Sequence, residues 1–247
     1  MMIETLTNTD LTEKKTMSQR QPKESLDMGR VVTIDGPAAS GKTSVSRELA
    51  RRLGWSWVST GAFYRGLAFC AHELNLDLDN EIELAQLSLS SRWRVELTDS
   101  HTRVFLDQRD VTDKINAEVV GNIASKISHF PMVRQSLLTP QRALAGVAGR
   151  AQGLVAEGRD CGTVVFPQAE VKIYLTANQE NRAERRAKEL GLSTEETVQA
   201  QAQRDKQDST RKAAPLSVPE NALIVDTTEL GFKEVVDLIE DFVRKHI

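Results

Sequence analysis

The sequence contains little cysteine and no long apolar run. Its 247 residues include two cysteines, Cys70 and Cys161, which lie far apart and form no metal-ligand spacing. This argues against both a disulfide framework and a zinc site, and it favours a reducing compartment. No segment approaches the roughly 18 apolar residues of a membrane-spanning helix, and the N-terminus lacks the apolar core and cleavage site of a secretory signal. We therefore expect a cytoplasmic protein that does not bind membranes.

No charge of one sign dominates the sequence either. It contains 32 Lys and Arg against 35 Asp and Glu, a formal net charge of -3, and its pI is about 5.9. This balance disfavours binding of nucleic acid through a broad basic surface. Any anion site must then be a local cluster of arginine or lysine. The length fits one α/β domain with insertions, or at most two small domains.

The sequence does contain a series of short apolar runs, beginning after residue 30. Residues 1–29 are polar and without steady periodicity, so we predict a flexible tail there. The runs are rich in Val, Ile or Leu and are separated by helical stretches, which is typical of parallel strands buried on both faces. They cover residues 31–35, 55–59, 154–157, 171–176 and 222–226. The pattern predicts an α/β fold with five parallel strands.

The first run leads directly into a glycine-rich loop, "GPAASGKTS", at residues 36–44. The spacing G-x-x-x-x-G-K-[ST] is followed by a helical pattern of Val45, Leu49 and Leu53 that stops at Gly54. Strand, loop and helix form a phosphate-binding unit, in which backbone N–H groups and the helix N-terminus hold phosphates. We predict that a nucleoside triphosphate binds to Gly36, Pro37, Ala38, Ala39, Ser40, Gly41, Lys42, Thr43 and Ser44.

Two loop residues and one acid carry the predicted chemistry of this donor site. Lys42 supplies a positive charge for the β- and γ-phosphates, and the Thr43 hydroxyl is a ligand for Mg²⁺. An acid at the end of a buried strand usually completes such a metal site, and Glu157 and Asp226 both follow such strands. Glu157 is preferred because it lies among other polar residues. Asp226 is explained equally well as a helix N-cap or a loop acid.

Arginines at helical spacing predict a group that closes over the phosphates. Arg182, Arg185 and Arg186 lie at i, i+3 and i+4 and therefore share one helical face. Alone, this pattern is explained better by a solvated charged face. Together with a phosphate loop in the same chain, the pattern instead favours a phosphate-binding role for these arginines, because phosphoryl transfer needs mobile positive groups that exclude water.

Three further polar clusters predict a pocket for an acceptor molecule. Each contains arginine and lies beyond a predicted strand or on one helical face, and open α/β sheets bind ligands at their strand ends. Each cluster alone is explained by surface ion pairs, but their combination favours a pocket. The clusters are Thr60, Tyr64 and Arg65; Arg159 and Asp160; and Arg204, Asp208 and Arg211.

One stretch departs from the α/β rhythm. Residues 92–111 alternate apolar and polar side chains and turn through "TDSHT", which predicts an antiparallel hairpin inserted as a small lobe. Residues 113–128 and 132–148 then have helical patterns, separated at Phe130 and Pro131.

These motifs, in this order, resemble the bacterial cytidylate kinases, the CMP and dCMP kinase branch of the nucleoside monophosphate kinases. The similarity covers about residues 31–247, and "GRDCGTVVFP" with the downstream "DSTR" is far more specific than the phosphate loop. The other matching segments are "TIDGPAASGKT", "STGAFYR", "FPMVRQSLL", "VKIYLTA" and "RDKQDSTRKAAPL". The resemblance implies phosphorylation of CMP and dCMP by ATP with Mg²⁺, in pyrimidine nucleotide metabolism, by a monomer.

The resemblance also implies a domain organisation. The fold would be a P-loop NTPase-like three-layer α/β fold with a five-stranded parallel sheet. Its core would cover about residues 30–87 and 116–247, within one kinase domain at 30–247. A small antiparallel lobe at about 88–115 would form a CMP-binding insert, and a helical lid would lie at about 178–210.

The resemblance assigns the phosphate contacts of the two substrates. Thr60, Arg65 and Arg159 would hold the CMP phosphate, with Tyr64 packed beside it. Catalytic charge would come from Lys42, Arg159, Arg182, Arg185 and Arg186.

The base and sugar contacts follow from the same resemblance. Ser125, Arg134 and Asp160 would read the base. A carboxylate and an arginine match cytosine and leave unpaired groups against uracil. The sugar and adjoining groups would contact Arg204, Asp208 and Arg211, with Arg211 in reach of the phosphate.

The sequence departs from the family pattern at a few positions. Members often have Gly where Thr43 stands and Ser where Thr60 stands, and the stretch at 139–153 is a few residues longer than usual. Two alternatives stay open: another small P-loop kinase with a different acceptor, and a nucleotide-binding switch that transfers nothing. The absence of a guanine-reading Asn-Lys-x-Asp segment disfavours a switch GTPase.

Overall fold

The structure is a computed structural model that describes residues 30–98, 102–148, 152–191, 193–211 and 213–247. Every structural statement below refers to this part of the chain. The tail predicted at residues 1–29 and the centre of the turn predicted in the lobe, residues 99–101, lie outside the described residues.

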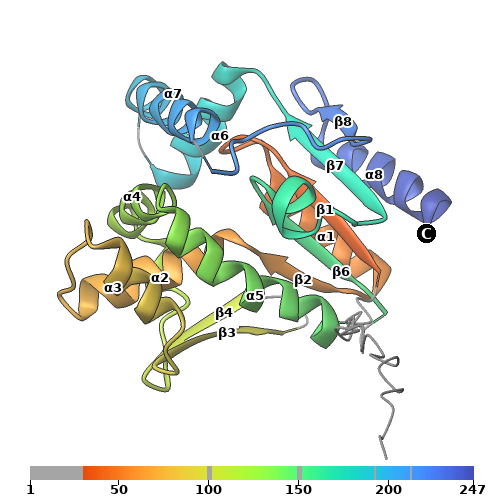
Figure 1. The fold of residues 1–247 in the computed structure, drawn as a ribbon. Coiled ribbons are helices and arrows are strands. Elements are labelled where there is room, and N and C mark those ends of the chain that lie inside the picture. Colours follow the sequence, from red (N-terminus) through yellow and green to blue (C-terminus); the bar gives the residue numbers. More distant parts are fainter. Residues whose placement is uncertain (1–29, 99–101, 149–151, 192, 212) are drawn as a thin grey trace, which may run out of the picture.

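A five-stranded parallel sheet forms the centre of the fold (Figure 1). Each strand begins and ends within one residue of its predicted run, so the prediction of five parallel strands is confirmed. In spatial order the strands are β2 (Ser56–Ser59), β6 (Leu154–Gly158), β1 (Val31–Asp35), β7 (Val171–Thr176) and β8 (Leu223–Asp226). β2 and β6 lie on one side of β1 in the sheet, and β7 and β8 lie on the other. The carboxyl end of β1 is therefore a topological switch point.

Helices cover both faces of this sheet and complete a three-layer arrangement. Side chains of β1 alternate between the two faces: Val31 packs into one hydrophobic cluster and Val32 into the other. Because both faces are buried, the strands are apolar along their length, and the sequence shows them as continuous runs. One face carries α1 (Lys42–Leu53) and α8 (Phe232–His246), and the other carries α2 (Gly61–Glu73), α4 (Glu118–Ile127) and α5 (Pro131–Ala148).

A second, antiparallel sheet is formed by β3 (Trp93–Leu97), β4 (Thr102–Leu106) and β5 (Arg109–Asp110). It confirms the predicted lobe, but the predicted two-stranded hairpin lacked β5. Asp107 and Gln108 connect β4 to β5, and their φ angles are 45° and 67°. Two-residue turns with positive φ favour Asn, Asp or Gly. Asp107 is one of these but Gln108 is not, so the sequence carries only a weak signal for this turn.

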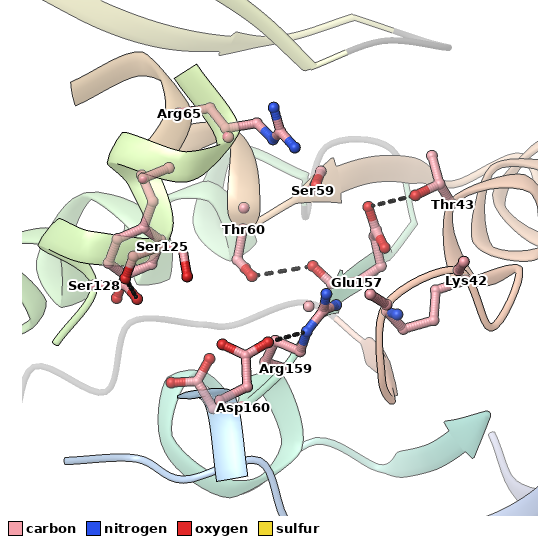
Figure 2. Close-up of a pocket in the computed structure, with 18 of the residues that line it drawn as sticks. Lys42, Thr43, Ser59, Thr60, Arg65, Ser125, Ser128, Glu157, Arg159 and Asp160 are labelled. Carbon is pink, nitrogen blue, oxygen red and sulfur yellow. Dashed lines mark hydrogen bonds and ion pairs between the residues drawn. The ribbon is translucent and has the colours of Figure 1, made fainter. Parts of the chain in front are cut away.

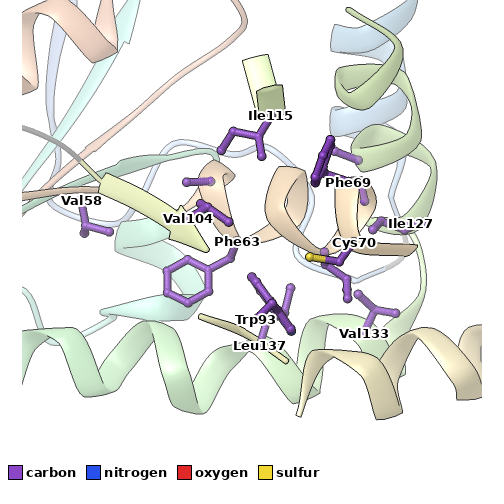
Figure 3. Close-up of a cluster of buried hydrophobic side chains, with 14 of the residues drawn as sticks. Val58, Phe63, Phe69, Cys70, Trp93, Val104, Ile115, Ile127, Val133 and Leu137 are labelled. Atoms are coloured by element: carbon purple, nitrogen blue, oxygen red, sulfur yellow. The ribbon is translucent and has the colours of Figure 1, made fainter. Parts of the chain in front are cut away.

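The lobe is joined to the main core through α2 (Figure 3). Trp93 packs edge-on against Phe63, with 6.4 Å between the ring centroids, and its indole N–H donates to the Leu87 carbonyl at 3.0 Å. A Cβ at Gly66 would lie 2.9 Å from both Trp93 and Val104 side-chain atoms. Only glycine allows α2 to approach the lobe this closely. The lobe therefore shares a hydrophobic core with α2, α4 and α5.

The remaining elements are helices and short helical turns outside the two sheets. The helix predicted at 113–128 is divided into a 3-10 turn and α4, because Ala117 has φ −57° and ψ 146° between them. α6 and α7 pack against each other. Among the described helices none is long and apolar enough to span a membrane. The remaining elements are α3 (Glu81–Ser88), η1 (Lys114–Asn116), the π-helical turn η3 (Cys161–Val165), α6 (Gln179–Leu190) and α7 (Thr194–Thr210).

Candidate active site

The carboxyl ends of β1, β2 and β6 open into one cavity, whose wall is completed by α2, α4, α6 and α7 (Figure 2). Most of the predicted site residues line it. Of the others, Gly36, Pro37, Ser40, Arg134, Arg182 and Arg185 are not part of the wall, and the side chain of Arg204 lies outside what the structure describes. Lining the cavity are Ala38, Ala39, Gly41, Lys42, Thr43, Ser44, Thr60, Tyr64, Arg65, Ser125, Glu157, Arg159, Asp160, Arg186, Asp208 and Arg211.

The phosphate loop follows β1 and ends at the first turn of α1. A Cβ at Gly36 would lie 2.0 Å from the Leu175 carbonyl oxygen, so glycine is required where the loop passes β7. The ammonium group of Lys42 donates to the Pro37 carbonyl and to Ser40 Oγ at 3.3 Å. Burial, and to a smaller extent the nearby Arg159, lower the pKa of Lys42 to about 7. A phosphate oxygen would restore the charged form of this lysine.

Thr43 and Glu157 meet at the cavity although 114 residues separate them in sequence. Thr43 Oγ1 donates to Glu157 Oε1 at 3.1 Å. Both are hard oxygen donors, the type that Mg²⁺ prefers. The alternative acid, Asp226, is exposed and accepts hydrogen bonds from the Thr228 backbone N–H (2.9 Å) and hydroxyl (2.6 Å). The structure therefore brings Glu157, and not Asp226, to the predicted metal position.

The predicted acceptor-phosphate residues surround the middle of the cavity. Thr60 Oγ1 donates to the Glu157 carbonyl at 3.0 Å, and Arg65 Nη1 donates to the Ile115 carbonyl at 3.0 Å. Arg159 Nε donates to Asp208 Oδ2 at 2.9 Å. Arg159 lies close enough to Lys42 to lower its pKa. Two cations thus stand next to each other between the phosphate loop and the acceptor side.

Arg134 and Asp160 form a buried ion pair in which both side chains are 7% exposed, and Asp160 is the member that lines the cavity. Arg134 also donates to the Ser128 carbonyl at 3.2 Å, and its guanidinium lies 5.5 Å from the centroid of the Tyr64 ring. Burial raises the pKa of Tyr64 to about 12, so it stays a neutral ring. The structure brings together two of the three residues that the resemblance assigns to the base, and the third, Ser125, lines the cavity.

Arg211 is buried beside this pair with hydrogen-bonding capacity to spare. Its Nη1 lies 3.7 Å from Asp208 Oδ1 and 3.5 Å from Ser128 Oγ. Its Nε and Nη2 have no hydrogen-bond partner within the described part of the chain, and burial lowers its pKa. Buried donors without partners are costly. An anionic ligand in the cavity would satisfy them.

The three arginines of α6 lie beside the phosphate loop or its cavity but have different partners, and a Cβ at Gly41 of the loop would lie 4.0 Å from Arg185 Nη1. Arg182 is buried and donates to the Ala38 carbonyl of the phosphate loop at 3.2 Å and to Asp205 of α7. Arg185 donates to Thr227, through its hydroxyl at 3.0 Å and its carbonyl at 2.8 Å. Only Arg186 of the three reaches the cavity wall. Side chains at i, i+3 and i+4 point in somewhat different directions around a helix. Here α7 contacts the side chain of Arg182, and the segment after β8 contacts that of Arg185.

Sequence reasoning missed three residues of this site. Asp35 is fully buried before the loop and accepts hydrogen bonds from two backbone amides of η3. Asp205 also accepts from the Ala38 N–H at 3.3 Å, and Ser128 contacts both Arg134 and Arg211. A usable signal existed for Asp35, since a carboxylate that ends a fully apolar strand run needs a partner. Nothing in the sequence distinguishes Asp205 or Ser128 from surface residues.

This strand, loop and helix at the switch point of a parallel sheet define a P-loop nucleotide-binding protein. The sequence model described as "Cytidylate kinase" matches residues 32–245. The chain belongs to the cytidylate kinase family.

Named relatives agree with this assignment. A protein of Bdellovibrio bacteriovorus named cytidylate kinase is 63% identical over 89% of this chain and 100% of its own length. A Shewanella loihica protein of the same name is 40% identical over 94% of this chain and 98% of its own. Among solved structures, a gluconokinase of Sinorhizobium meliloti covers 89% of this chain and 94% of its own, with 12% identity and a TM-score of 0.46.

Proposed function

We propose that the protein transfers the γ-phosphoryl group of ATP to the phosphate of CMP or dCMP, releasing ADP and CDP or dCDP. The observation that carries the proposal is one cavity lined by the phosphate loop, by Arg159 and by Asp160, whose ion-pair partner Arg134 lies behind the wall. Membership of the cytidylate kinase family supports the same reaction.

The donor triphosphate would lie on the phosphate loop. The loop amides and the N-terminus of α1 favour its negative charge. Lys42 would exchange its bond to the Pro37 carbonyl for the β- and γ-phosphate oxygens. Arg182 would keep the loop in place through the Ala38 carbonyl, while Arg186 contributes positive charge from the cavity wall.

Thr43 and Glu157 fit a Mg²⁺ ion bound together with the triphosphate. The described residues include no group of three or more His, Cys, Asp or Glu that could hold a metal by itself. This agrees with the usual binding of Mg²⁺ by one or two carboxylates, substrate phosphates and water. When bound, the ion neutralises negative charge on the phosphates.

The acceptor CMP would lie between α2, α4 and the start of η3. Thr60, Arg65 and Arg159, which line the cavity, would hold its phosphate, and Tyr64 would lie alongside. Asp160 would accept from the cytosine amino group, and Arg134 would donate toward the ring acceptor. Uracil offers the opposite pattern at both positions, so the same pair disfavours UMP. Ser125 would join the base contact, and Asp208 and Arg211, with Arg204, would hold the sugar.

The reaction then needs little covalent work from the protein. An oxygen of the CMP phosphate attacks the γ-phosphorus as the bond to the β,γ-bridging oxygen breaks, and ADP leaves. The attacking oxygen is already anionic, so no general base is required. Lys42 and Arg159 would balance the charge from opposite sides of the transferred group, and their positions provide most of the catalysis.

We further propose roles for the two peripheral regions. α6 and α7, at about residues 178–210, would act as the lid over the donor phosphates, because their side chains reach the loop at Ala38. The lobe at about 88–115 would cover the CMP side, because it packs on α2, which carries Tyr64 and Arg65. We expect the protein to act as a cytoplasmic monomer with Mg²⁺, and a single 27.4 kDa species in sedimentation would support the monomer.

A coupled assay of ADP release tests the proposed function. We expect CMP and dCMP to support turnover with ATP and Mg²⁺, with UMP and AMP at least about ten-fold poorer in kcat/KM. Release that does not depend on CMP would contradict the kinase function. Turnover of UMP equal to that of CMP would instead contradict only the roles of Arg134 and Asp160.

A further inference from the structure

Asp35 is a buried carboxylate that touches the backbone of the acceptor side. It ends β1, one residue before the phosphate loop, and its side chain is fully buried. Asp35 Oδ1 accepts from the Cys161 N–H at 2.8 Å, and Oδ2 accepts from the Gly162 N–H at 2.7 Å. The carboxylate itself does not line the cavity. It therefore contacts neither nucleotide in the proposed function.

The two amides belong to the first turn of η3, which starts directly after Asp160. Helix-like turns leave their first N–H groups and last C=O groups without internal partners. At the other end of η3, Arg142 of α5 donates from Nε to the Val165 carbonyl and from Nη2 to the Val164 carbonyl, both at 2.8 Å. The turn is thus held by a negative group at its N–H end and a positive group at its C=O end, which matches its dipole.

This double attachment bears on the acceptor site because of where the turn begins. The side chains of Arg159 and Asp160 leave the backbone just before the two amides that Asp35 holds. Asp160 reaches Arg134 and Arg159 reaches Asp208. A small rotation of the backbone at Cys161 would move both side chains, and displacement of a positioned group by about 1 Å costs up to about 100-fold in rate.

We propose that Asp35 and Arg142 are positioning residues for the acceptor nucleotide. They orient η3 so that Arg159 meets the acceptor phosphate and Asp160 meets the base. Asp35 lies one residue before the phosphate loop, but its side-chain hydrogen bonds go to η3, so its effect should fall on the acceptor side. This inference rests on the proposed function, because it assigns Arg159 and Asp160 to CMP.

The burial of Asp35 makes a purely structural role a poor explanation. Burial raises its pKa to about 6, although the two amides that it accepts from lower it. An ionised carboxylate at this position therefore destabilises the fold at neutral pH. An asparagine would be neutral but would direct an NH₂ group at one of the two amides. Only the carboxylate can accept from both.

The variant Asp35→Asn tests the proposal. We expect KM for CMP to rise about ten-fold and the preference for CMP over UMP to fall by a similar factor, while KM for ATP changes less than about two-fold. Asp226→Asn is the matched control, since Asp226 also ends a strand of this sheet and accepts from a backbone N–H, away from the cavity. The control should leave all three quantities unchanged.

Arg142 provides an independent test at the other end of the turn. Arg142→Met should also raise KM for CMP selectively. Arg142→Lys should restore only part of the affinity, because an ammonium group lacks the planar fork of N–H donors with which the guanidinium binds two carbonyls at once. Equal changes for CMP and ATP, or none, in the folded variants would overturn the proposal. Failure of the wild type to phosphorylate CMP would instead overturn the proposed function.

A pH profile of the wild type tests the same idea without a variant. Above about pH 6 Asp35 is ionised and holds both amides; below it, protonation removes one acceptor oxygen. The ratio of kcat/KM for CMP to that for UMP should therefore decrease as the pH falls through about 6. Titration of the substrate phosphate cancels in this ratio. The charged or titratable groups that interact with Asp35 are Asp160, Lys42, Cys161 and Tyr174. A constant ratio would overturn the proposal.

Discussion

Replacement of Asp160 by alanine is expected to lower the free energy of unfolding by about 3–5 kcal/mol. The variant leaves the Arg134 guanidinium buried without its carboxylate, and its remaining contacts among the described residues are the Ser128 carbonyl and the Tyr64 ring. The variant should also lose about 10- to 100-fold in its preference for CMP over UMP, because the group that accepts from the cytosine amino group is gone. Urea unfolding and the acceptor panel measure the two effects separately.

An exposed ion pair provides the control for this prediction. Arg94 and Glu96 of β3 pair at 2.6 Å with 42% and 45% of their side-chain surfaces exposed. Glu96→Ala should cost no more than about 1 kcal/mol, because water screens the pair and solvates the remaining charge. A loss for Asp160→Ala that is no larger than this would show that Arg134 finds another partner. An unchanged CMP preference would remove Asp160 from base recognition.

Replacement of Lys42 by methionine is expected to have opposite effects on activity and stability. The value of kcat should fall by about 100- to 1000-fold, because a preorganised charge at the transferred group is removed. The free energy of unfolding should rise, because the wild-type ammonium is buried with its pKa lowered from 10.5 to about 7. The gain should be complete below about pH 7, where the folded wild type must bury a charged lysine, and should vanish as the pH rises toward 10.5.

Thermal unfolding between pH 6 and 9 with single-turnover kinetics tests this prediction. The variant Lys233→Met serves as the control, since Lys233 is 81% exposed on α8 and lies far from the cavity. It should change neither quantity measurably. A destabilised Lys42→Met variant would mean that the bonds to Pro37 and Ser40 outweigh the cost of burying the charge.

The elements around the donor site were predictable from short stretches of sequence. A strand buried on both faces is largely apolar, so the run at 31–35 matches β1, and the run at 171–176 matches β7, in which every second side chain is buried. The glycines of the loop, the lysine and the helical period after them are local properties. The short strand β5 was missed because Gln108, in the turn before it, has a positive φ angle that the sequence gives no reason to expect.

Contacts between distant segments were harder to predict. The sequence left Glu157 and Asp226 as alternative metal ligands, and the pairing of β6 beside β1 decided between them by bringing Glu157 to Thr43. Helical spacing placed Arg182, Arg185 and Arg186 on one face, and the packing of α7, β8 and α4 gave them three different partners. The role of Asp35 depends on η3 lying over the end of β1.

By itself the sequence determined the parallel sheet, the phosphate loop and the residue types of both substrate sites, because backbone propensity and side-chain period act over a few residues. The tertiary structure alone decided which of those residues meet. Strand order and helix packing set the distances between segments more than 100 positions apart, as between Thr43 and Glu157. No local pattern records those distances. The Thr43–Glu157 contact, the buried Arg134–Asp160 pair and the hydrogen bonds of Asp35 and Arg142 to η3 all depend on them.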